Sequence, residues 1–285
     1  MMRSPVWRIG GKGNHLKRLL SKIPTHKIYC EVFGGSAALL LNKPPSPIEI
    51  LNDLDEGLVH FFRVLRDPDK FALLQQKLEL TPCSRSEYHH SLKTWNDEPD
   101  SVDRALKWFV VNRQSFSGRF GSGWGFSVNK SRRNRAGAVS EWQTAISDMK
   151  QFNERLLRVQ IECHDWEKIL ATYDSEDTFF FLDPPYVHST RTMDIYTHEM
   201  TDQDHERLCH AILSLKGKWL LCGYDNPIYR ILESNPNVHR EQFQTSCYAA
   251  GRTRTSKLQG ANSAKMLQPR TEVLWWNEDP LQANS

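Results

Sequence analysis

Four consecutive residues combine side chains suited to binding a planar ring that carries an amino group: Asp183, Pro184, Pro185 and Tyr186. They follow an apolar run at 178–182 that is typical of a buried strand. Ligands of open α/β sheets bind at such strand ends. The prolines lack N–H groups and fix φ, so the carbonyls of this rigid turn are free to accept hydrogen bonds. Asp183 adds a charged acceptor and Tyr186 a flat face, although an ordinary proline-rich turn has the same composition.

A second candidate site lies at a glycine turn near the N-terminus. Gly34 and Gly35 follow a predicted strand at 27–33, and glycine there lets a ligand approach the backbone closely. Asp53 ends the next predicted strand, 18 residues beyond Gly35, near the spacing of about 20 residues at which an acid binds ribose hydroxyls. The pattern is not G-x-G-x-x-G, so it suits a nucleoside cofactor without phosphates better than a dinucleotide.

The segment Gly10-Gly11-Lys12-Gly13 contains the elements of a phosphate-binding loop but not their order. The Walker pattern requires a glycine five residues before the Gly-Lys pair and a serine or threonine after the lysine. We therefore reject an NTPase. Taken by itself, the segment is also consistent with a solvated N-terminal turn.

Two stretches of the chain are basic and contain no acid. The first, 113–135, holds six cations, with Phe116, Phe120, Trp124 and Phe126 interleaved among glycines. The second, 245–270, holds five cations among small and polar residues. Cations neutralise phosphates and aromatic rings stack on bases, so both stretches favour polyanion binding over the alternative of a solvated charged face. The candidate nucleic-acid contacts are Arg113, Arg119, Trp124, Lys130, Arg132, Arg133, Arg135, Arg252, Arg254 and Lys257.

Composition excludes several classes of protein. The chain has 285 residues, 39% of them hydrophobic and 25% charged, with a net charge of only +3, which is typical of a globular protein. Six scattered cysteines form no C-x-x-C pair and the histidines lack ligand spacing, so we expect no metal. The N-terminus lacks a signal peptide and no apolar run approaches 18 residues, so we expect a cytoplasmic monomer without a membrane span.

These motifs must be positioned by an interrupted α/β domain. We predict a catalytic domain from residues 1–66 and 151–285, and an inserted, mainly helical domain at 67–150 that carries the first basic stretch. The predicted strands are 27–33, 48–51, 158–163, 178–182, 219–224, 238–244 and 272–276. The predicted helices are 14–23, 37–42, 57–65, 70–80, 101–112 and 202–215.

Taken in order, these motifs resemble the Dam-like, alpha-group family of adenine-N6 DNA methyltransferases over most of the chain. The order of an N-terminal Gly-Gly-Lys, a cofactor motif, a recognition insertion and a catalytic tetrapeptide is specific to that group. Residues 112–115 and the Gly-Trp-Gly that follows resemble phage- or prophage-borne members. The segments that carry the resemblance are Arg8–Lys12, Glu31–Ser36, Leu51–Asp53, Asp183–Tyr186 and Glu272–Leu274.

The resemblance implies a Rossmann-like, mostly seven-stranded α/β fold that uses S-adenosylmethionine. Lys12 and Arg8 would contact this cofactor, and Asp53 would bind its ribose hydroxyls. Asp165 matches a position that can hold the adenine ring of the cofactor, and Asp183 would lie between cofactor and target base. The implied cofactor-binding residues are Arg8, Lys12, Phe33, Gly34, Gly35, Asp53, Asp165 and Asp183.

The implied reaction is methyl transfer to the N6 amine of an adenine flipped out of double-stranded DNA. Asp183, Pro184 and Tyr186 would be the catalytic residues: two acceptors for the amine and a ring that stacks on the base. Cytosine N4, an RNA base and a protein glutamine amide remain alternative substrates, and a non-catalytic DNA-binding module remains an alternative of another class. Aspartate in the tetrapeptide and the order of motifs favour adenine, and the intact tetrapeptide with Asp53 favours an enzyme.

Overall fold

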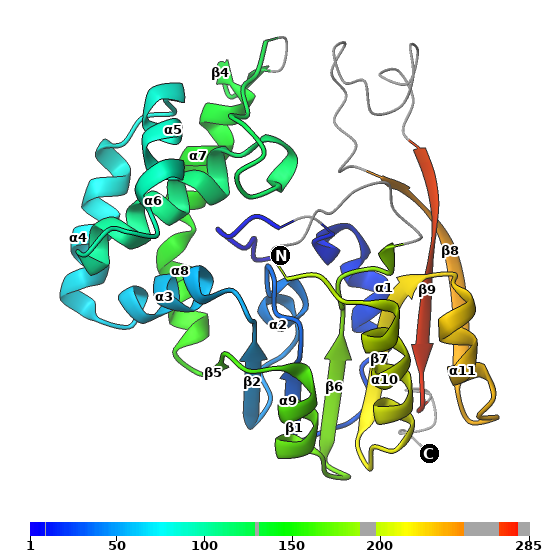
Figure 1. Cartoon of the computed structure of the whole chain (residues 1–285). Helices are drawn as coiled ribbons and strands as arrows, with labels where there is room; N and C mark the ends of the chain where they lie inside the picture. The colour runs from blue at the N-terminus through cyan, green and yellow to red at the C-terminus, as the bar shows by residue number, and fades with distance from the viewer. Residues whose placement is uncertain (9, 129–130, 189–197, 248–267, 279–285) are drawn as a thin grey trace.

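The computed structural model describes residues 1–8, 10–128, 131–188, 198–247 and 268–278. Seven strands form one sheet in the order β5-β2-β1-β6-β7-β9-β8 (Figure 1). β9 is antiparallel to both β7 and β8, and the other paired strands of this sheet are parallel. The strands are β1 Ile28–Glu31, β2 Ile48–Asn52, β5 Gln160–Glu162, β6 Thr178–Leu182, β7 Lys218–Tyr224, β8 His239–Cys247 and β9 Gln268–Trp276. The seven strands predicted from the sequence are all present, which confirms the α/β sheet.

Helices cover both faces of the sheet, which explains the continuous apolar character of the central strands. In β6, Phe179 and Phe181 pack on one face with α1 (Leu16–Leu20) and α2 (Ala38–Asn42). The alternate residues Phe180 and Leu182 pack on the other face, because successive side chains of a strand point to opposite sides. That second face is covered by α9 (Trp166–Tyr173), α10 (Asp202–Leu213), the short helix η4 (Pro227–Tyr229) and α11 (Arg230–Glu233).

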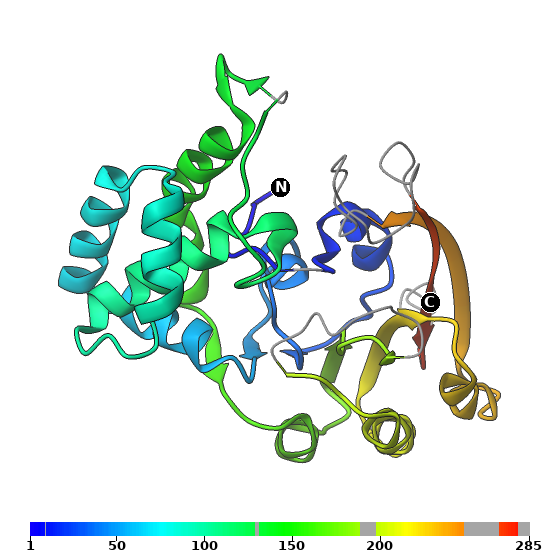
Figure 2. The ribbon, with the colours of Figure 1, turned by 45° about the horizontal axis from the view of Figure 1, so that its top comes forward.

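A separate group of helices lies beyond the β5–β2 edge of the sheet (Figures 1 and 2). Its centre is α6 (Ser101–Gln114), which packs against α3 (Glu56–Leu65), α4 (Pro68–Leu80), α5 (Arg85–Thr94) and α7 (Gly137–Ser147). We call α4 to α7 the helical unit. Aspartate or serine caps begin α3 to α6 by accepting hydrogen bonds from their first turns. α8 (Met149–Leu156) then returns the chain to β5.

A short hairpin projects from the helical unit on the side where the parallel strands have their carboxyl ends (Figure 1). It pairs β3 (Ser131–Arg132) with β4 (Arg135–Ala136). Arg133 and Asn134 form its turn with φ of 51° and 60°, the positive values that such tight hairpin turns require. The sequence predicted neither this hairpin nor helices α5, α7, α8 and α9. Strands of two residues carry no alternation, α5 and α7 bury serine as well as apolar residues, and α8 and α9 are only eight residues long.

Candidate active site

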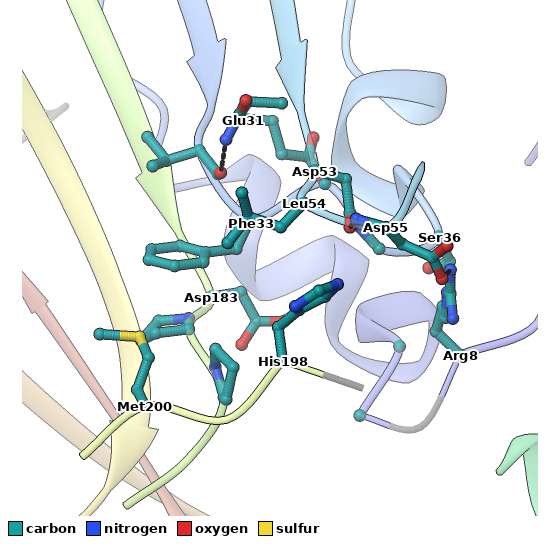
Figure 3. A pocket seen from close by; sticks show the side chains of 18 of the residues that line it. Arg8, Glu31, Phe33, Ser36, Asp53, Leu54, Asp55, Asp183, His198 and Met200 are labelled. Carbon is teal, nitrogen blue, oxygen red and sulfur yellow. Dashed lines mark hydrogen bonds and ion pairs between the residues drawn. The ribbon is translucent and has the colours of Figure 1, made fainter. Parts of the chain in front are cut away.

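A cavity of about 590 Å³ opens at the carboxyl ends of β1, β2 and β6 (Figure 3). Here the strand order reverses, since the chain passes from β1 to β2 on one side and later to β6 on the other. Residue 8 and residues 10–12 of the N-terminal segment, a loop of the helical unit at 118–122 and residues 198–200 complete its wall. The cavity brings together every residue that the sequence assigned to the cofactor: Arg8, Lys12, Phe33, Gly34, Gly35, Asp53, Asp165 and Asp183.

The two glycines of the turn after β1 are constrained in different ways, Gly34 by space and Gly35 by its backbone conformation. A Cβ on Gly34 would lie 2.7 Å from Leu51 Cδ1 and 2.9 Å from the Asn52 carbonyl oxygen. Gly35 has a φ of +50°, in the left-handed region that favours glycine. Its N–H donates to Asp53 Oδ2 at 2.7 Å, so the carboxylate and the turn hold each other in place. The turn therefore offers close backbone approach beside a fixed acid.

Lys12 and Asp183 form an ion pair at the end of β6. The Lys12 ammonium lies 2.7 Å from Asp183 Oδ1 and donates to the Gly10 carbonyl at 3.0 Å. Burial acts to lower the pKa of Lys12, but the carboxylates of Asp183 and Glu272 outweigh it and hold that pKa above its ordinary value. Burial raises the pKa of Asp183, and the Lys12 charge opposes the rise. Lys12 thus occupies one oxygen of Asp183 and leaves the other for a ligand in the cavity.

Tyr186 is anchored by groups that the sequence did not indicate. Its hydroxyl donates to Glu272 Oε2 at 2.6 Å, and its ring meets that of Tyr224 edge to face with centroids 4.5 Å apart. The Lys12 ammonium lies 4.9 Å from the Tyr186 ring centre. Tyr186 is 6% exposed and, unlike Asp183, Pro184 and Pro185, is not among the described residues that line the cavity. The sequence placed Glu272 in a segment that carries the family resemblance, but nothing in it indicated a contact with Tyr186.

The N-terminal segment divides its side chains between the cavity and the helical unit. Arg8 lines the cavity and pairs with Asp55, the residue whose side chain caps α3. The Asn112 side chain accepts from the Trp7 N–H at 2.8 Å and donates to the Trp7 carbonyl at 2.9 Å. The Trp7 ring packs against Gly118, where a Cβ would come within 2.8 Å of Trp7 Nε1. Arg8 therefore belongs to the cavity, and Trp7 fastens this segment to α6.

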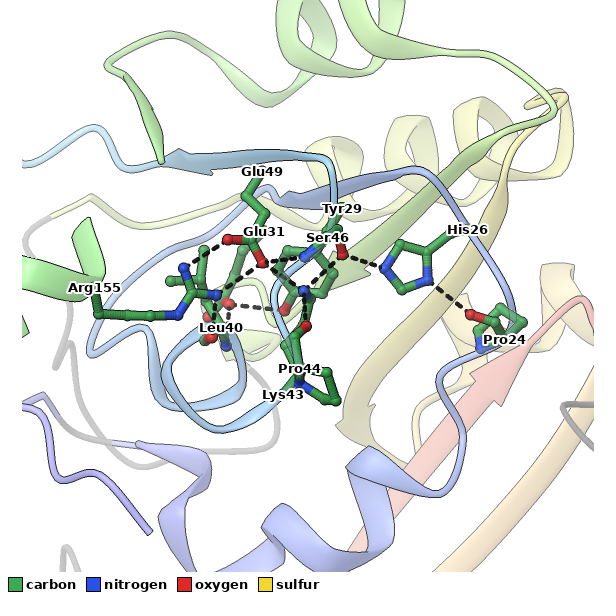
Figure 4. Close-up of polar contacts among 10 residues, drawn as sticks. All are labelled: Pro24, His26, Tyr29, Glu31, Leu40, Lys43, Pro44, Ser46, Glu49 and Arg155. Atoms are coloured by element: carbon green, nitrogen blue, oxygen red, sulfur yellow. Dashed lines mark hydrogen bonds and ion pairs between the residues drawn. The ribbon is translucent and has the colours of Figure 1, made fainter. Parts of the chain in front are cut away.

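A buried polar network lies beneath the cavity (Figure 4). Arg155 donates to both carboxylate oxygens of Glu49, at 2.6 and 2.8 Å, and to the Leu40 carbonyl. The Lys43 ammonium lies 2.5 Å from the same carboxylate. Burial acts to raise the pKa of Glu49, but the hydrogen bonds from Arg155 and Lys43 hold it below its ordinary value. This network fastens α8 and α2 to β2.

Glu31 lines the cavity and lies next to this network (Figure 4), and no sequence pattern indicated a role of its own for it. It accepts from the Tyr29 hydroxyl at 2.8 Å and from the Leu40 N–H at 3.1 Å. Burial raises the pKa of Glu31 to about 8, although these hydrogen bonds oppose the rise. Glu31 is therefore an acid with a perturbed pKa that faces a cavity, a combination that often marks a functional site.

The basic residues of the insertion have different surroundings. Arg119 lines the cavity. Trp124 stacks on Phe126 and donates to Gln114, with the Arg85 guanidinium 4.8 Å from its ring centre. The side chains of Arg132, Arg133 and Arg135 lie in exposed positions on the hairpin, whereas Arg113 is partly buried under it. Lys130, Arg252, Arg254 and Lys257 lie outside the described residues.

The described residues hold neither a metal cluster nor a membrane-spanning helix. Within them, no three His, Cys, Asp or Glu side chains gather as a metal site would require. Among the described helices, none has the length and apolar character needed to cross a membrane.

Comparison with known sequences agrees with this geometry. The sequence model of one family, described as D12 class N6 adenine-specific DNA methyltransferase, matches residues 9–246. The match includes the glycine turn, Asp53, the helical unit and residues 183–186. No curated protein matches the chain.

Proposed function

Since this chain belongs to the D12 class of N6 adenine-specific DNA methyltransferases, it transfers a methyl group from S-adenosylmethionine to the N6 amine of adenine in DNA, and we propose that Asp183 and Pro184 bind that amine. The observation that carries the assignment is the Lys12–Asp183 pair at the end of β6, beside the cavity that Asp53 and the glycine turn border.

The residues present fit S-adenosylmethionine. We propose that Asp53 accepts hydrogen bonds from the ribose hydroxyls and that the glycine turn admits the nucleoside close to the backbone. Gly34 has no space for a Cβ, and Asp53 is fixed by the Gly35 N–H. Arg8, Lys12, Phe33 and Asp165 complete the proposed site. When bound, the cofactor supplies an electrophilic methyl group on a sulfonium.

The amine needs help because its lone pair is delocalised into the adenine ring. Two acceptors, the Asp183 carboxylate and the Pro184 carbonyl, would each take one N–H of the amine and stabilise positive charge as it develops. Lys12 occupies Oδ1 of Asp183 at 2.7 Å, which fixes the carboxylate and leaves Oδ2 for the amine. Holding the nitrogen in line with the methyl carbon would provide the remaining acceleration.

The adenine must leave the duplex to reach this site, at a cost of a few kcal/mol. We propose that Tyr186 offsets part of this cost by stacking on the flipped base, which contributes about 1–3 kcal/mol. Its hydrogen bond to Glu272 and its contact with Tyr224 support this role, because they fix the ring plane before the base arrives.

We further propose that the insertion at 67–150 recognises double-stranded DNA through its basic face. The exposed arginines of the hairpin support this role, because the hairpin projects on the side where the parallel strands have their carboxyl ends (Figure 1), and the cavity opens at those ends. A cytoplasmic monomer remains our proposal for the working state of the protein.

The decisive experiment is mass spectrometry of nucleosides from duplex DNA incubated with the protein and S-adenosylmethionine. We expect N6-methyladenine, and none with an Asp183→Ala variant that retains its melting temperature. N4-methylcytosine, or methylation only of an RNA substrate, would contradict the proposed specificity. Failure to bind S-adenosylmethionine in calorimetry would point to a non-catalytic DNA-binding module.

A further inference from the structure

A second cavity, of about 350 Å³, lies in the helical unit beneath the hairpin. Its walls come from the N-terminal residues 3–4, the end of α6, the hairpin and α7. None of the residues that line it also lines the active-site cavity. Its charged lining residues are Arg3, Arg113, Arg132, Arg133, Glu141 and Asp148.

Arg113, in the wall of this cavity, has a partly buried charge that forms no ion pair with an acid among the described residues. Its Nη2 donates to the Glu141 backbone carbonyl at 3.2 Å, and its guanidinium lies 5.3 Å from the Trp7 ring centre. Its Nε is buried without a hydrogen-bond partner. Within the described part of the chain, no carboxylate comes within the 4.0 Å of an ion pair with Arg113.

This arrangement is costly to fold. A charge removed from water loses several kcal/mol of solvation unless an opposite charge replaces it. Burial lowers the pKa of Arg113 to about 10, although the Glu141 carboxylate opposes the change. A protein tolerates such an unpaired cation where a ligand supplies the missing negative charge.

We propose that this second cavity binds a phosphodiester group of the DNA backbone, with Arg113 in its wall and the hairpin arginines at its rim. The proposal rests on the DNA methyltransferase function and adds a specific anchoring point to it. A guanidinium can donate two parallel hydrogen bonds to phosphate oxygens, which suits Arg113 to this ligand.

The lining and the position of the cavity narrow the ligand further. Four arginines and two acids, Glu141 and Asp148, line the cavity, so its net charge is positive and suits an anion. This charge accommodates either a phosphodiester or a free phosphate, and the position of the cavity favours a link in a nucleic-acid backbone. The hairpin at the rim stands on the same side of the molecule as the active-site cavity, where a bound duplex must lie (Figure 1).

The test is the salt dependence of DNA binding by Arg113→Met in the full-length chain. Removing one phosphate contact should lower the slope of log affinity against log salt by about 0.9. The melting temperature should stay the same or rise, because an apolar side chain replaces an unpaired cation. Arg158→Met, an exposed arginine that lines neither cavity, is the matched control and should leave the slope unchanged.

Two further measurements distinguish a backbone phosphodiester from a free phosphate and from a purely structural role of Arg113. Arg132→Gln with Arg133→Gln changes the rim without touching the buried side chain, so its slope should also fall. An unchanged slope for Arg113→Met overturns the proposal, even if the rim variant lowers the slope, and so does stabilisation of the wild type, but not of Arg113→Met, by millimolar inorganic phosphate at constant ionic strength. Because binding is measured without turnover, these results are independent of whether the wild type methylates adenine.

Discussion

Arg155 of α8 and Arg113 of α6 are both removed from solvent to some degree, yet the fold provides a carboxylate partner for Arg155 and not for Arg113 among the described residues. Arg155 lies in the network beneath the active-site cavity, where Glu49 accepts two of its hydrogen bonds and the Leu40 carbonyl a third. Arg113 lies in the second cavity, where its guanidinium contacts a backbone carbonyl and the Trp7 ring. The first region is complete as folded, whereas the second has positive charge left for a ligand.

The same contrast separates the two cavities. In the active-site cavity the Asp183 carboxylate is already paired with Lys12, and Asp53 already accepts from the Gly35 N–H. Under the hairpin, four arginines face two acids. The difference predicts that changes in the first region affect chemistry or stability, and that changes in the second affect mainly DNA affinity.

The largest effect should come from Asp183→Ala. Without the carboxylate that accepts from the amine, turnover should fall by at least about 100- to 1,000-fold. Single-turnover methylation of a duplex measures this effect. Asp177→Ala, at the opposite end of β6 and exposed, is the control and should keep normal turnover. Near-normal turnover of Asp183→Ala would remove the central assignment.

Glu49→Ala tests whether the buried network is complete as folded. The change leaves Lys43 and Arg155 without their shared partner, so unfolding free energy should fall by about 3–5 kcal/mol in a urea titration. Replacing all three residues, with Lys43→Met, Glu49→Leu and Arg155→Met, should recover most of that loss. If Glu49→Ala were as stable as the wild type, the Glu49 carboxylate would not stabilise the buried charge of Arg155, and the contrast with Arg113 would be lost.

Asp53→Ala tests the fixed acid of the active-site cavity. The loss of charge-assisted hydrogen bonds to the ribose, each worth about 1.5–3 kcal/mol, should weaken S-adenosylmethionine binding at least tenfold. Calorimetry measures this change. The salt slope of DNA binding should not move. A normal cofactor dissociation constant would mean that Asp53 only supports the turn at Gly35.

The paired variants Tyr186→Phe and Tyr186→Ala separate the ring from the hydroxyl. Phe keeps the stacking face, so turnover per folded molecule should stay near normal, while the melting temperature drops because buried Glu272 loses its donor. Ala should lower turnover by roughly 10- to 100-fold, because about 1–3 kcal/mol of stacking disappears. Equal losses of turnover in both variants would assign the role to the hydroxyl, and a fully active Ala variant would leave Tyr186 a packing role only.

The smallest effect on chemistry should come from the hairpin. Neutralising Arg132, Arg133 and Arg135 together should weaken DNA binding and reduce the salt slope by about 0.9 for each phosphate that the variant no longer binds. Cofactor affinity and saturated turnover should remain unchanged. By contrast, Asp53→Ala should weaken cofactor binding and Asp183→Ala should lower turnover. A slope identical to that of the wild type would identify the hairpin as a solvated face and weaken the contrast between the two regions.

The sequence alone predicted the strands of the sheet and the set of residues that line the first cavity. Runs such as 178–182 are continuous and apolar because helices cover both faces of the sheet, and glycine and proline mark where those strands end. Motifs at strand ends converge because parallel strands end at one edge, so the cofactor residues could be grouped before their positions were known. Helices α5 and α7 of the insertion were harder to predict. The residues that each of them buries include serine as well as apolar residues, so no continuous apolar face marks them in the sequence.

Only the tertiary structure decided which charges meet. Lys12 pairs with Asp183, and Glu272 accepts a hydrogen bond from Tyr186. Arg119 lines the active-site cavity, unlike the exposed arginines of the same basic stretch. No sequence pattern distinguishes Arg113 from Arg155. The packing of α6 places Arg113 in the wall of the second cavity, and the packing of α8 places Arg155 against the Glu49 carboxylate. Ion pairs form between side chains that are distant along the chain, so their burial and compensation depend on the whole fold rather than on any local pattern.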